Sequence, residues 1–235
     1  MTKLNCLISL IFAAFAATAS ENNAKQPTSR EVNQETLSCL VPSNCVISFS
    51  SYGLDALTFE GNGEQAMSLL RAALACGDPV IYIEHKTLWG LEGPVDESVQ
   101  VPLGKAAVLR PGDHLTMVSW SRQVQVCQTA CEQLAALGVQ VELIDLRTLW
   151  PWDRETVLKS AAKTGHLLVV HEAIQAAGFG AAIAATVAET LGVRVKRLGA
   201  PRIPVGYAPV LEAVARVSAD QIVAAAQDCL KPVPR

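Results

Sequence analysis

Hydrophobic and polar positions alternate regularly through the second half of the chain. Short apolar runs such as LTMVSWS and HLLVVHEA recur, and between them apolar residues fall at helical spacing. The pattern predicts strands at 115–121, 139–146, 166–173 and 193–200, and helices at 122–137, 153–163 and 178–191. Buried strands that alternate with helices of this length predict an α/β fold, with a mostly parallel twisted sheet, flanking helices and right-handed crossovers.

The first hundred residues are less regular. A helix is predicted over 63–75, and PVIYIEH (79–85) follows it as a short buried strand. The turn-rich segment TLWGLEGPVDES separates these elements from the alternating region. We therefore expect a domain boundary near residue 99 and a second domain over 100–235, with a linker or unassigned segment at 20–52.

Residues 1–19 have the layout of a secretory signal peptide. One early lysine precedes an apolar stretch, and Ala17-Thr18-Ala19 resembles a cleavage site. A genuine leader predicts secretion, although upstream sequence joined to an unrelated domain would give the same pattern. The apolar stretch is short for a membrane span, and no other segment is long enough to cross a bilayer.

Composition narrows the function classes. Half of the 235 residues are hydrophobic, 17% are charged and the formal net charge is −3, which is typical of a globular protein. No Lys/Arg stripe interleaves with aromatic residues, so nucleic acid is not an expected partner. The seven cysteines form no CxxC pair and no zinc-spaced cluster. Cys127 and Cys131, one helical turn apart, are expected to act as small buried hydrophobes.

Three candidate site residues fall at the carboxyl ends of predicted strands, where ligands of parallel α/β sheets usually bind. Arg147 could hold a carboxylate or phosphate, or could fix its loop to Asp145. His171 could act as an acid or base beside Glu172. Neighbouring residues on a strand point to opposite faces, however, so a structural role at the strand end is the preferred interpretation for His171 and Glu172.

Gly178 and Gly180 open a helix directly after a strand, as glycines do in dinucleotide sites. The third position of that fingerprint is Ile183, so the evidence for a phosphate cradle is weak. The two glycines and the alanines that follow them instead favour close backbone approach at a packed interface.

Five blocks together resemble a known family. They are PVIYIEHKTLWG, PLGKAAVLRPGDHLTMVSWSR, VELIDLRTLWPWD, KTGHLLVVHEAIQAAGFGAAIA and PRIPVGYAPVLE. Their order and spacing are similar to those of the beta subunit of the decarboxylating component of 2-oxo acid dehydrogenase complexes, of the pyruvate, acetoin or branched-chain type. The resemblance covers roughly residues 53 to 230, and residues 100–230 match the transketolase C-terminal-like domain.

The resemblance implies a thiamine-diphosphate enzyme with magnesium, built from alpha subunits and paired beta subunits. It also implies oxidative decarboxylation of a 2-oxo acid, acyl transfer to a lipoyl acyltransferase core, and a cytoplasmic or mitochondrial-matrix location. Residues 53–99 would be a remnant of the pyrimidine-binding domain, and the stretch expected to carry the cofactor-activating glutamate is not recognisable. We therefore assign no catalytic residue and expect the chain to be inactive alone.

The family also binds a structural potassium ion at a turn that aligns with Ala73, Leu74, Cys76 and Asp78. Cys76 stands where the family usually has aspartate, and a thiol is a poor ligand for a hard cation. Two other interpretations of the chain stay open. It could be a non-catalytic oligomerisation or binding module, which could also be exported. It could instead be a gene fragment whose first 52 residues do not belong to the original protein.

Overall fold

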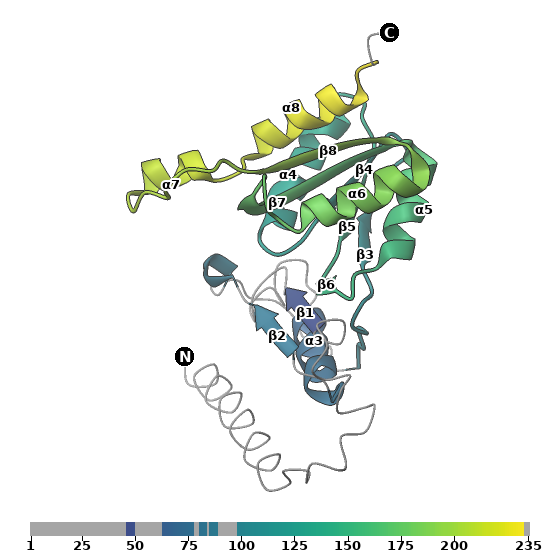
Figure 1. The fold of residues 1–235 in the computed structure, drawn as a ribbon, viewed down its shortest axis with the longest axis vertical. Coiled ribbons are helices and arrows are strands. Elements are labelled where there is room, and N and C mark those ends of the chain that lie inside the picture. Colours follow the sequence, from purple (N-terminus) through teal and green to yellow (C-terminus); the bar gives the residue numbers. More distant parts are fainter. Residues whose placement is uncertain (1–45, 50–62, 78–79, 84, 89–97, 233–235) are drawn as a thin grey trace, which may run out of the picture. The chain divides into compact units, whose positions relative to one another are not determined.

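A computed structural model describes residues 46–49, 63–77, 80–83, 85–88 and 98–232 (Figure 1). Every described element belongs to one compact unit, Cys45–Arg235. The predicted leader, Cys39, Cys45 and Asp78 lie outside the described residues. In the described part of the chain, no helix is both long and apolar enough to cross a membrane.

The larger sheet has five strands in the order β3-β5-β4-β7-β8. They are β3 (Ala107–Arg110), β4 (Leu115–Ser119), β5 (Val141–Asp145), β7 (His166–Ile174) and β8 (Arg194–Ala200). β4 runs parallel to β5 and to β7, and β7 runs parallel to β8. This confirms the mostly parallel sheet. Edge strand β3, which is antiparallel to β5, was not predicted.

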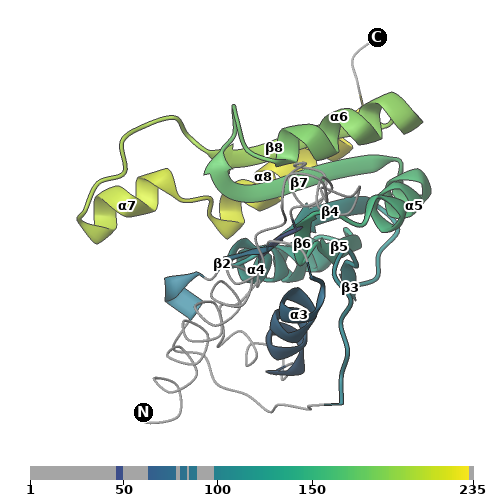
Figure 2. The same ribbon diagram turned by 60° about the horizontal axis from the view of Figure 1, so that its bottom comes forward.

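Helices cover both faces of this sheet (Figures 1 and 2). On one face lie α4 (Gln123–Ala136) and α8 (Ala219–Leu230), and on the other lie α5 (Arg154–Thr164) and α6 (Gly180–Leu191). The central strands β4 and β5 are buried along their whole length, because helices cover both of their faces. The α/β fold class predicted from the sequence is therefore confirmed.

The helix boundaries follow local sequence chemistry. Asp153 caps α5 by accepting a hydrogen bond from the Thr156 amide, as predicted. Helices α5 and α6 end at Gly165 and Gly192, both in the left-handed conformation that glycine adopts without strain. α8 begins with a complete capping box between Ser218 and Gln221.

A smaller sheet has the order β2-β1-β6. Its strands are β2 (Val80–Ile83), β1 (Val46–Phe49) and β6 (Thr148–Trp150), and α3 (Gly63–Ala75) precedes β2 as predicted. β1 pairs with β2 in parallel and with β6 in antiparallel orientation. Because β6 follows β5 closely along the chain, this pairing joins the two sheets. The short strands β1 and β6 were not predicted.

The chain between β8 and α8 forms what we call the α7 arm, residues 201–215, which includes α7 (Pro209–Ala215). In both views α7 lies away from the two helical layers (Figures 1 and 2). Its apolar side chains are largely exposed: Ile203, Val205, Tyr207, Val210, Leu211 and Val214. The arm thus contributes little to the core of its own chain.

Candidate functional site

The carboxyl ends of β5, β4 and β7 meet at one edge of the larger sheet, because these strands are neighbours and run in the same direction. Arg147, His171 and Glu172 all lie at this edge. Ser121, which follows β4, and Arg147, which follows β5, have φ values of 56° and 58°. Non-glycine residues in the left-handed region are uncommon and mark places where the fold holds the backbone under strain.

His171 is fully buried. Its ring stacks on Trp120 with ring centroids 5.4 Å apart and 18° between the planes, and Phe179 meets Trp120 edge-on. Nδ1 lies 3.0 Å from the Ala173 carbonyl, which can only accept, so Nδ1 carries the proton and donates. Burial lowers the pKa of His171, and the nearby positive charge of Arg197 acts in the same direction.

Three glycines make room for this ring. A Cβ on Gly178 would lie 2.5 Å from Cε1 of His171, and a Cβ on Gly180 would lie 2.5 Å from Cδ2. A Cβ on Gly199 would lie 2.8 Å from Cε1. The space above the Gly-Phe-Gly sequence is therefore filled by imidazole, and the glycines do not form a phosphate cradle. We call Trp120, Phe179 and the three glycines around His171 the His171 cradle.

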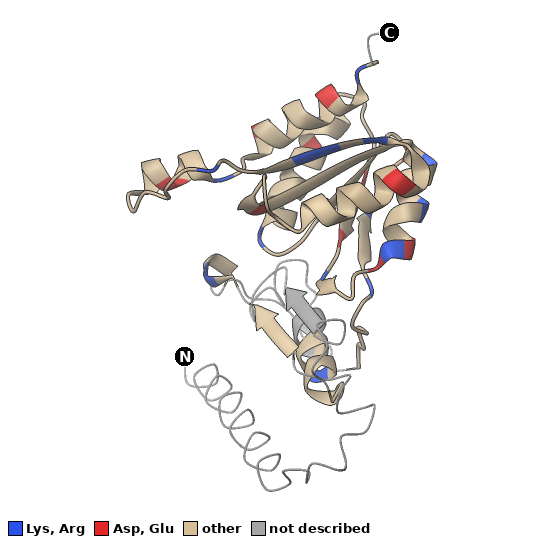
Figure 3. Cartoon of the chain, in the orientation of Figure 1, with Lys and Arg blue, Asp and Glu red and all other residues tan. Residues whose placement is uncertain are grey.

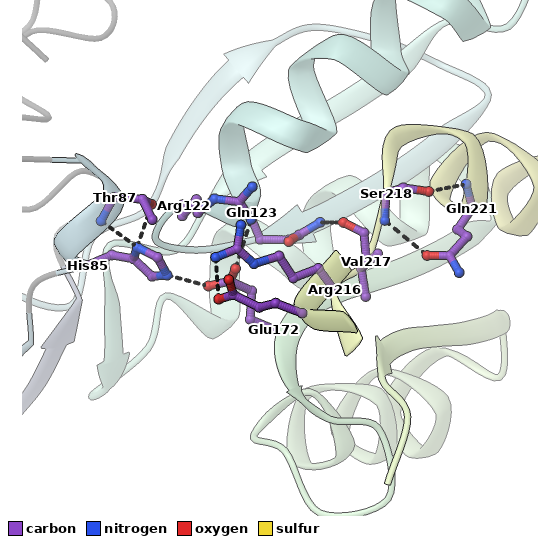
Figure 4. Close-up of polar contacts among 10 residues, drawn as sticks. His85, Thr87, Arg122, Gln123, Glu172, Arg216, Val217, Ser218 and Gln221 are labelled. Carbon is purple, nitrogen blue, oxygen red and sulfur yellow. Dashed lines mark hydrogen bonds and ion pairs between the residues drawn. The ribbon is translucent and has the colours of Figure 1, made fainter. Parts of the chain in front are cut away.

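Glu172 faces a different environment (Figure 4). Its Oε1 accepts from Arg122 at 2.9 Å and its Oε2 accepts from Nε2 of His85 at 3.1 Å. His85 is oriented in turn by Thr87, whose hydroxyl lies 2.7 Å from Nδ1. Burial alone would raise the pKa of Glu172, but the hydrogen bonds and charges of His85 and Arg122 outweigh it, so this pKa lies below its ordinary value.

These contacts join His85, just after β2 of the smaller sheet, to the end of β7 in the larger sheet. We call His85, Arg122 and Glu172 the Glu172 clasp. The structure thus places His171 and Glu172 in separate environments, one apolar and one ionic. A buried, stacked imidazole cannot reach a substrate, and a carboxylate held by two basic partners is a weak base.

Arg147 sits in the turn between β5 and β6. Its backbone N–H donates to Oδ1 of Asp145 at 3.1 Å, so the loop is fixed to Asp145 through the main chain. Asp145 itself is buried. This contact is made by the backbone of Arg147, so the role of its side chain stays a prediction.

The described residues at the aligned potassium position do not fit that ion. Ala73 is buried near the end of α3, Leu74 is exposed, and the Cys76 thiol donates to the Ala73 carbonyl at 3.2 Å. A thiol therefore occupies the space next to the carbonyl oxygen that a hard cation would need. Within the described ranges, no group of three or more His, Cys, Asp or Glu side chains could hold a metal ion.

Cys127 and Cys131 are small buried side chains, as the sequence predicts. Both are buried in the layer between α4 and α8. Burial raises the pKa of the Cys131 thiol to about 12 and that of Cys127 further still. Neither thiol is reactive in this setting.

Two parts of this region escaped the sequence analysis. Trp120 and Arg122 were recognised only as residues near a strand end, and the role of His85 was not foreseen. The Glu-His-Lys sequence after an apolar strand indicated a polar strand end. Nothing in the local sequence, however, indicated that His85 would pair with Glu172. The α7 arm could have been noticed, because IPVGYAPVLEAV is apolar without the spacing of a buried helix.

The family described as "Transketolase, C-terminal domain" matches residues 104–222. The chain is 38% identical over 179 residues to the mitochondrial pyruvate dehydrogenase E1 component subunit beta of Caenorhabditis elegans, covering 72% of this chain and 51% of that protein. It is 39% identical to the acetoin:2,6-dichlorophenolindophenol oxidoreductase subunit beta of Cupriavidus necator, covering 69% and 50%.

A third relative is the 2-oxoisovalerate dehydrogenase subunit beta of Bacillus subtilis, 36% identical, with 69% and 52% covered. The chain thus spans about half the length of these curated relatives. Among solved structures, "Split gene transketolase, inactive beta4 tetramer" superposes with a TM-score of 0.63 at 22% identity, covering 80% of this chain and 57% of that one. This last similarity supports the fold alone.

Proposed function

This chain belongs to the transketolase C-terminal domain family, and from that premise we propose that it is a beta-type subunit of a 2-oxo acid dehydrogenase decarboxylating component. In this role it would act in the oxidative decarboxylation of pyruvate or a related 2-oxo acid, with acyl transfer to a lipoyl group. It would be inactive alone and active only in an assembly with an alpha subunit and a second beta subunit.

The observation that carries this proposal is the exposed apolar surface of the α7 arm. Tyr207 is fully exposed, and Val210 and Val214 are each more than 60% exposed. On α6, three alanines one turn apart (Ala182, Ala185 and Ala188) also face solvent. Exposed apolar side chains in this number are typical of surfaces that another subunit covers.

The polar residues at the strand ends support a scaffold role. We assign His171, Gly178 and Gly180 to packing within the His171 cradle, and Glu172 to the clasp between the two sheets. Arg147 fixes the β5–β6 turn. A rigid edge of this kind would hold the smaller sheet, proposed to be the remnant of a pyrimidine-binding domain, in a fixed position beside the catalytic partner.

The cofactor proposed for the assembly is thiamine diphosphate with magnesium. The described residues do not form a site for it on their own, since the Gly-Phe-Gly backbone is covered by His171. We therefore derive no catalytic step in this chain. Potassium is not part of this proposal, because the described residues at the aligned position do not fit that ion.

A cytoplasmic or mitochondrial-matrix location and docking to a lipoyl acyltransferase core complete the proposal. Five relatives have names that place them in mitochondria, among them those from Caenorhabditis elegans, Arabidopsis thaliana and Chaetomium thermophilum. They lend no support to the secretion that the leader-like N-terminus predicts.

The test combines assembly with activity. The chain is purified alone and with an alpha subunit of a 2-oxo acid dehydrogenase from the same organism. Each sample is studied by sedimentation velocity, by titration with thiamine diphosphate and Mg²⁺, and by an assay of 2,6-dichlorophenolindophenol reduction with pyruvate, acetoin or 2-oxoisovalerate. We expect association, saturable cofactor binding and dye reduction only in the presence of the alpha subunit.

A matched pair of variants tests whether the α7 arm is the surface that the partner covers. Leu211 on the α7 arm and Leu137 after α4 are almost equally exposed, at 58% and 59%. Leu211→Asp should abolish association, whereas Leu137→Asp should leave it unchanged. Self-association without any binding of alpha or cofactor would instead favour a non-catalytic oligomerisation module.

A further inference from the structure

A hollow of about 270 Å³ lies beyond the carboxyl ends of β7 and β8. Its walls include Ile174, Ala176, Ala200 and Pro201, with Arg197 and Arg202 as the charged residues. The hollow therefore combines an apolar wall with two guanidinium groups. The carboxyl ends of parallel strands are the usual place for ligands in this class of fold.

Within the part of the chain that the structure describes, no carboxylate pairs with either arginine. Arg197 reaches across from β8 and donates to the carbonyl of Gln175 at 2.7 Å, which is a neutral partner. Two guanidinium groups at one hollow produce a local positive potential that an anion would relieve.

The other basic residues of β8 are arranged differently. Lys196 forms an ion pair with Asp228 of α8, and Arg194 donates to the carbonyl of Lys231. These side chains bind the C-terminal helix to the sheet. Figure 3 shows basic positions along β8 and along the connections to α7. The arginines at the hollow are thus different residues from Lys196 and Arg194, which contact the C-terminal helix and the residue after it.

We propose that this hollow binds a small organic carboxylate, with the carboxylate between Arg197 and Arg202 and an apolar body against Ile174 and Pro201. Arg side chains recognise carboxylates through paired N–H donors, and the apolar wall favours a hydrocarbon body over a bare inorganic anion. The volume lies below the range of roughly 300–1,000 Å³ that holds drug-sized ligands, so the ligand is smaller than a nucleotide. Pro201 and Arg202 begin the α7 arm, so we propose this site for the isolated chain, in which no partner covers the arm.

The test uses 4-(trifluoromethyl)benzoate as the probe and follows its ¹⁹F resonance as the full chain is titrated. The neutral 4-(trifluoromethyl)benzyl alcohol has the same body without the charge. We expect saturable binding of the benzoate and at least about tenfold weaker binding of the alcohol, because only the benzoate pairs with the guanidinium groups.

Variants then locate the bound probe. Arg202→Gln removes an exposed charge, so folding is preserved, and the dissociation constant should rise about tenfold. Arg197→Gln should have a similar effect. Arg194→Gln is the matched control: it removes the same charge from the opposite end of the same strand, and it should change the dissociation constant less than twofold.

Three results would overturn the proposal. The first is the absence of saturable benzoate binding to the unaltered chain. The second is that Arg194→Gln and Arg202→Gln weaken benzoate binding equally, which would show that only the net charge of the chain matters. The third is displacement of benzoate by inorganic phosphate at equal concentration, which would show that the apolar wall contributes nothing.

Discussion

The His171 cradle and the α7 arm are both rich in apolar atoms, yet they are organised in opposite ways. In the cradle, Trp120 and three glycines enclose a single imidazole so tightly that no added Cβ would fit. In the arm, Tyr207 and Val210 extend into solvent. The cradle completes its packing within one chain, whereas the arm offers apolar area that its own chain does not bury.

From this difference we infer that the cradle serves stability, and we propose that the arm serves association. Residues that resemble an active site, His171 and Glu172, are engaged by contacts within the chain. Residues without any catalytic chemistry, the aliphatic side chains of the arm, are the ones available to a partner. Substitutions in the two regions should therefore have opposite effects on stability and on assembly.

The largest loss of stability is expected for Gly180→Ala. A Cβ there would lie 2.5 Å from Cδ2 and 2.6 Å from Nε2 of His171, and the ring is held by Trp120 on its other side. Overpacking of this kind typically costs about 2–3 kcal/mol in the free energy of unfolding. Urea denaturation followed by circular dichroism measures this cost.

Gly138→Ala is the control for that experiment. Gly138 has a φ of 80°, and a Cβ there would meet nothing within 4 Å. The substitution should cost about 1 kcal/mol, from the left-handed backbone alone. An equal loss in the two variants would show that the cradle tolerates an extra methyl group and is not closely packed.

The sequence predicted the larger sheet well, because its strands and helices carry their own periodic signals. The run LTMVS and the alanine-rich α4 could be recognised without knowing their partners. The missed elements depend on pairing: β1 is four residues long and forms only between β2 and β6. α8 is an exception, since its Ser218–Gln221 capping box was a local signal that went unread.

The candidate site was less predictable for the same physical reason. The glycines of the cradle were expected to allow close approach, but their partner, the ring of His171, depends on how β7 turns into α6. The clasp joins Arg122 to a residue 50 positions away. Contacts of this range arise from the tertiary fold, and no local pattern encodes them.

A smaller loss is expected for Glu172→Gln, which leaves Arg122 and His85 without a charged acceptor. Hydrogen bonds to charged groups contribute roughly 1.5 kcal/mol when partly shielded from water. The pKa of Glu172 is lowered in the folded state, so its contribution is present above its ordinary value of 4.5 and is lost as the pH falls below that value. Urea denaturation at pH 7 and at pH 4 measures this dependence.

His171 and Glu172 should affect the free energy of unfolding over different pH ranges, and His171→Phe tests this difference. The pKa of His171 is also lowered, from an ordinary value of 6.5. The unfolded state therefore binds a proton at this histidine more readily than the folded state does, so the free energy of unfolding decreases as the pH drops below about 6.5. The Phe variant should flatten the stability curve as the pH falls below about 6.5, and Glu172→Gln should flatten it only below 4.5. If the stability of the Phe variant fell as steeply as that of the unaltered chain between these two pH values, His171 would not be the group responsible.

The smallest effect on stability is expected in the α7 arm. Val210→Ala removes two methyl groups from a side chain that is 78% exposed, so the free energy of unfolding of the isolated chain should change by less than about 0.5 kcal/mol. Val187→Ala makes the same chemical change in the core beneath α6 and should cost about 2 kcal/mol. The effects of the two variants on association with an alpha subunit should have the opposite order. Val210→Ala should weaken association, as measured by sedimentation velocity. Val187→Ala should not weaken it, once the measurement is corrected for the folded fraction. A loss of more than 1 kcal/mol from Val210→Ala in the isolated chain would show that the arm packs on its own domain, and the contrast between the two regions would not hold.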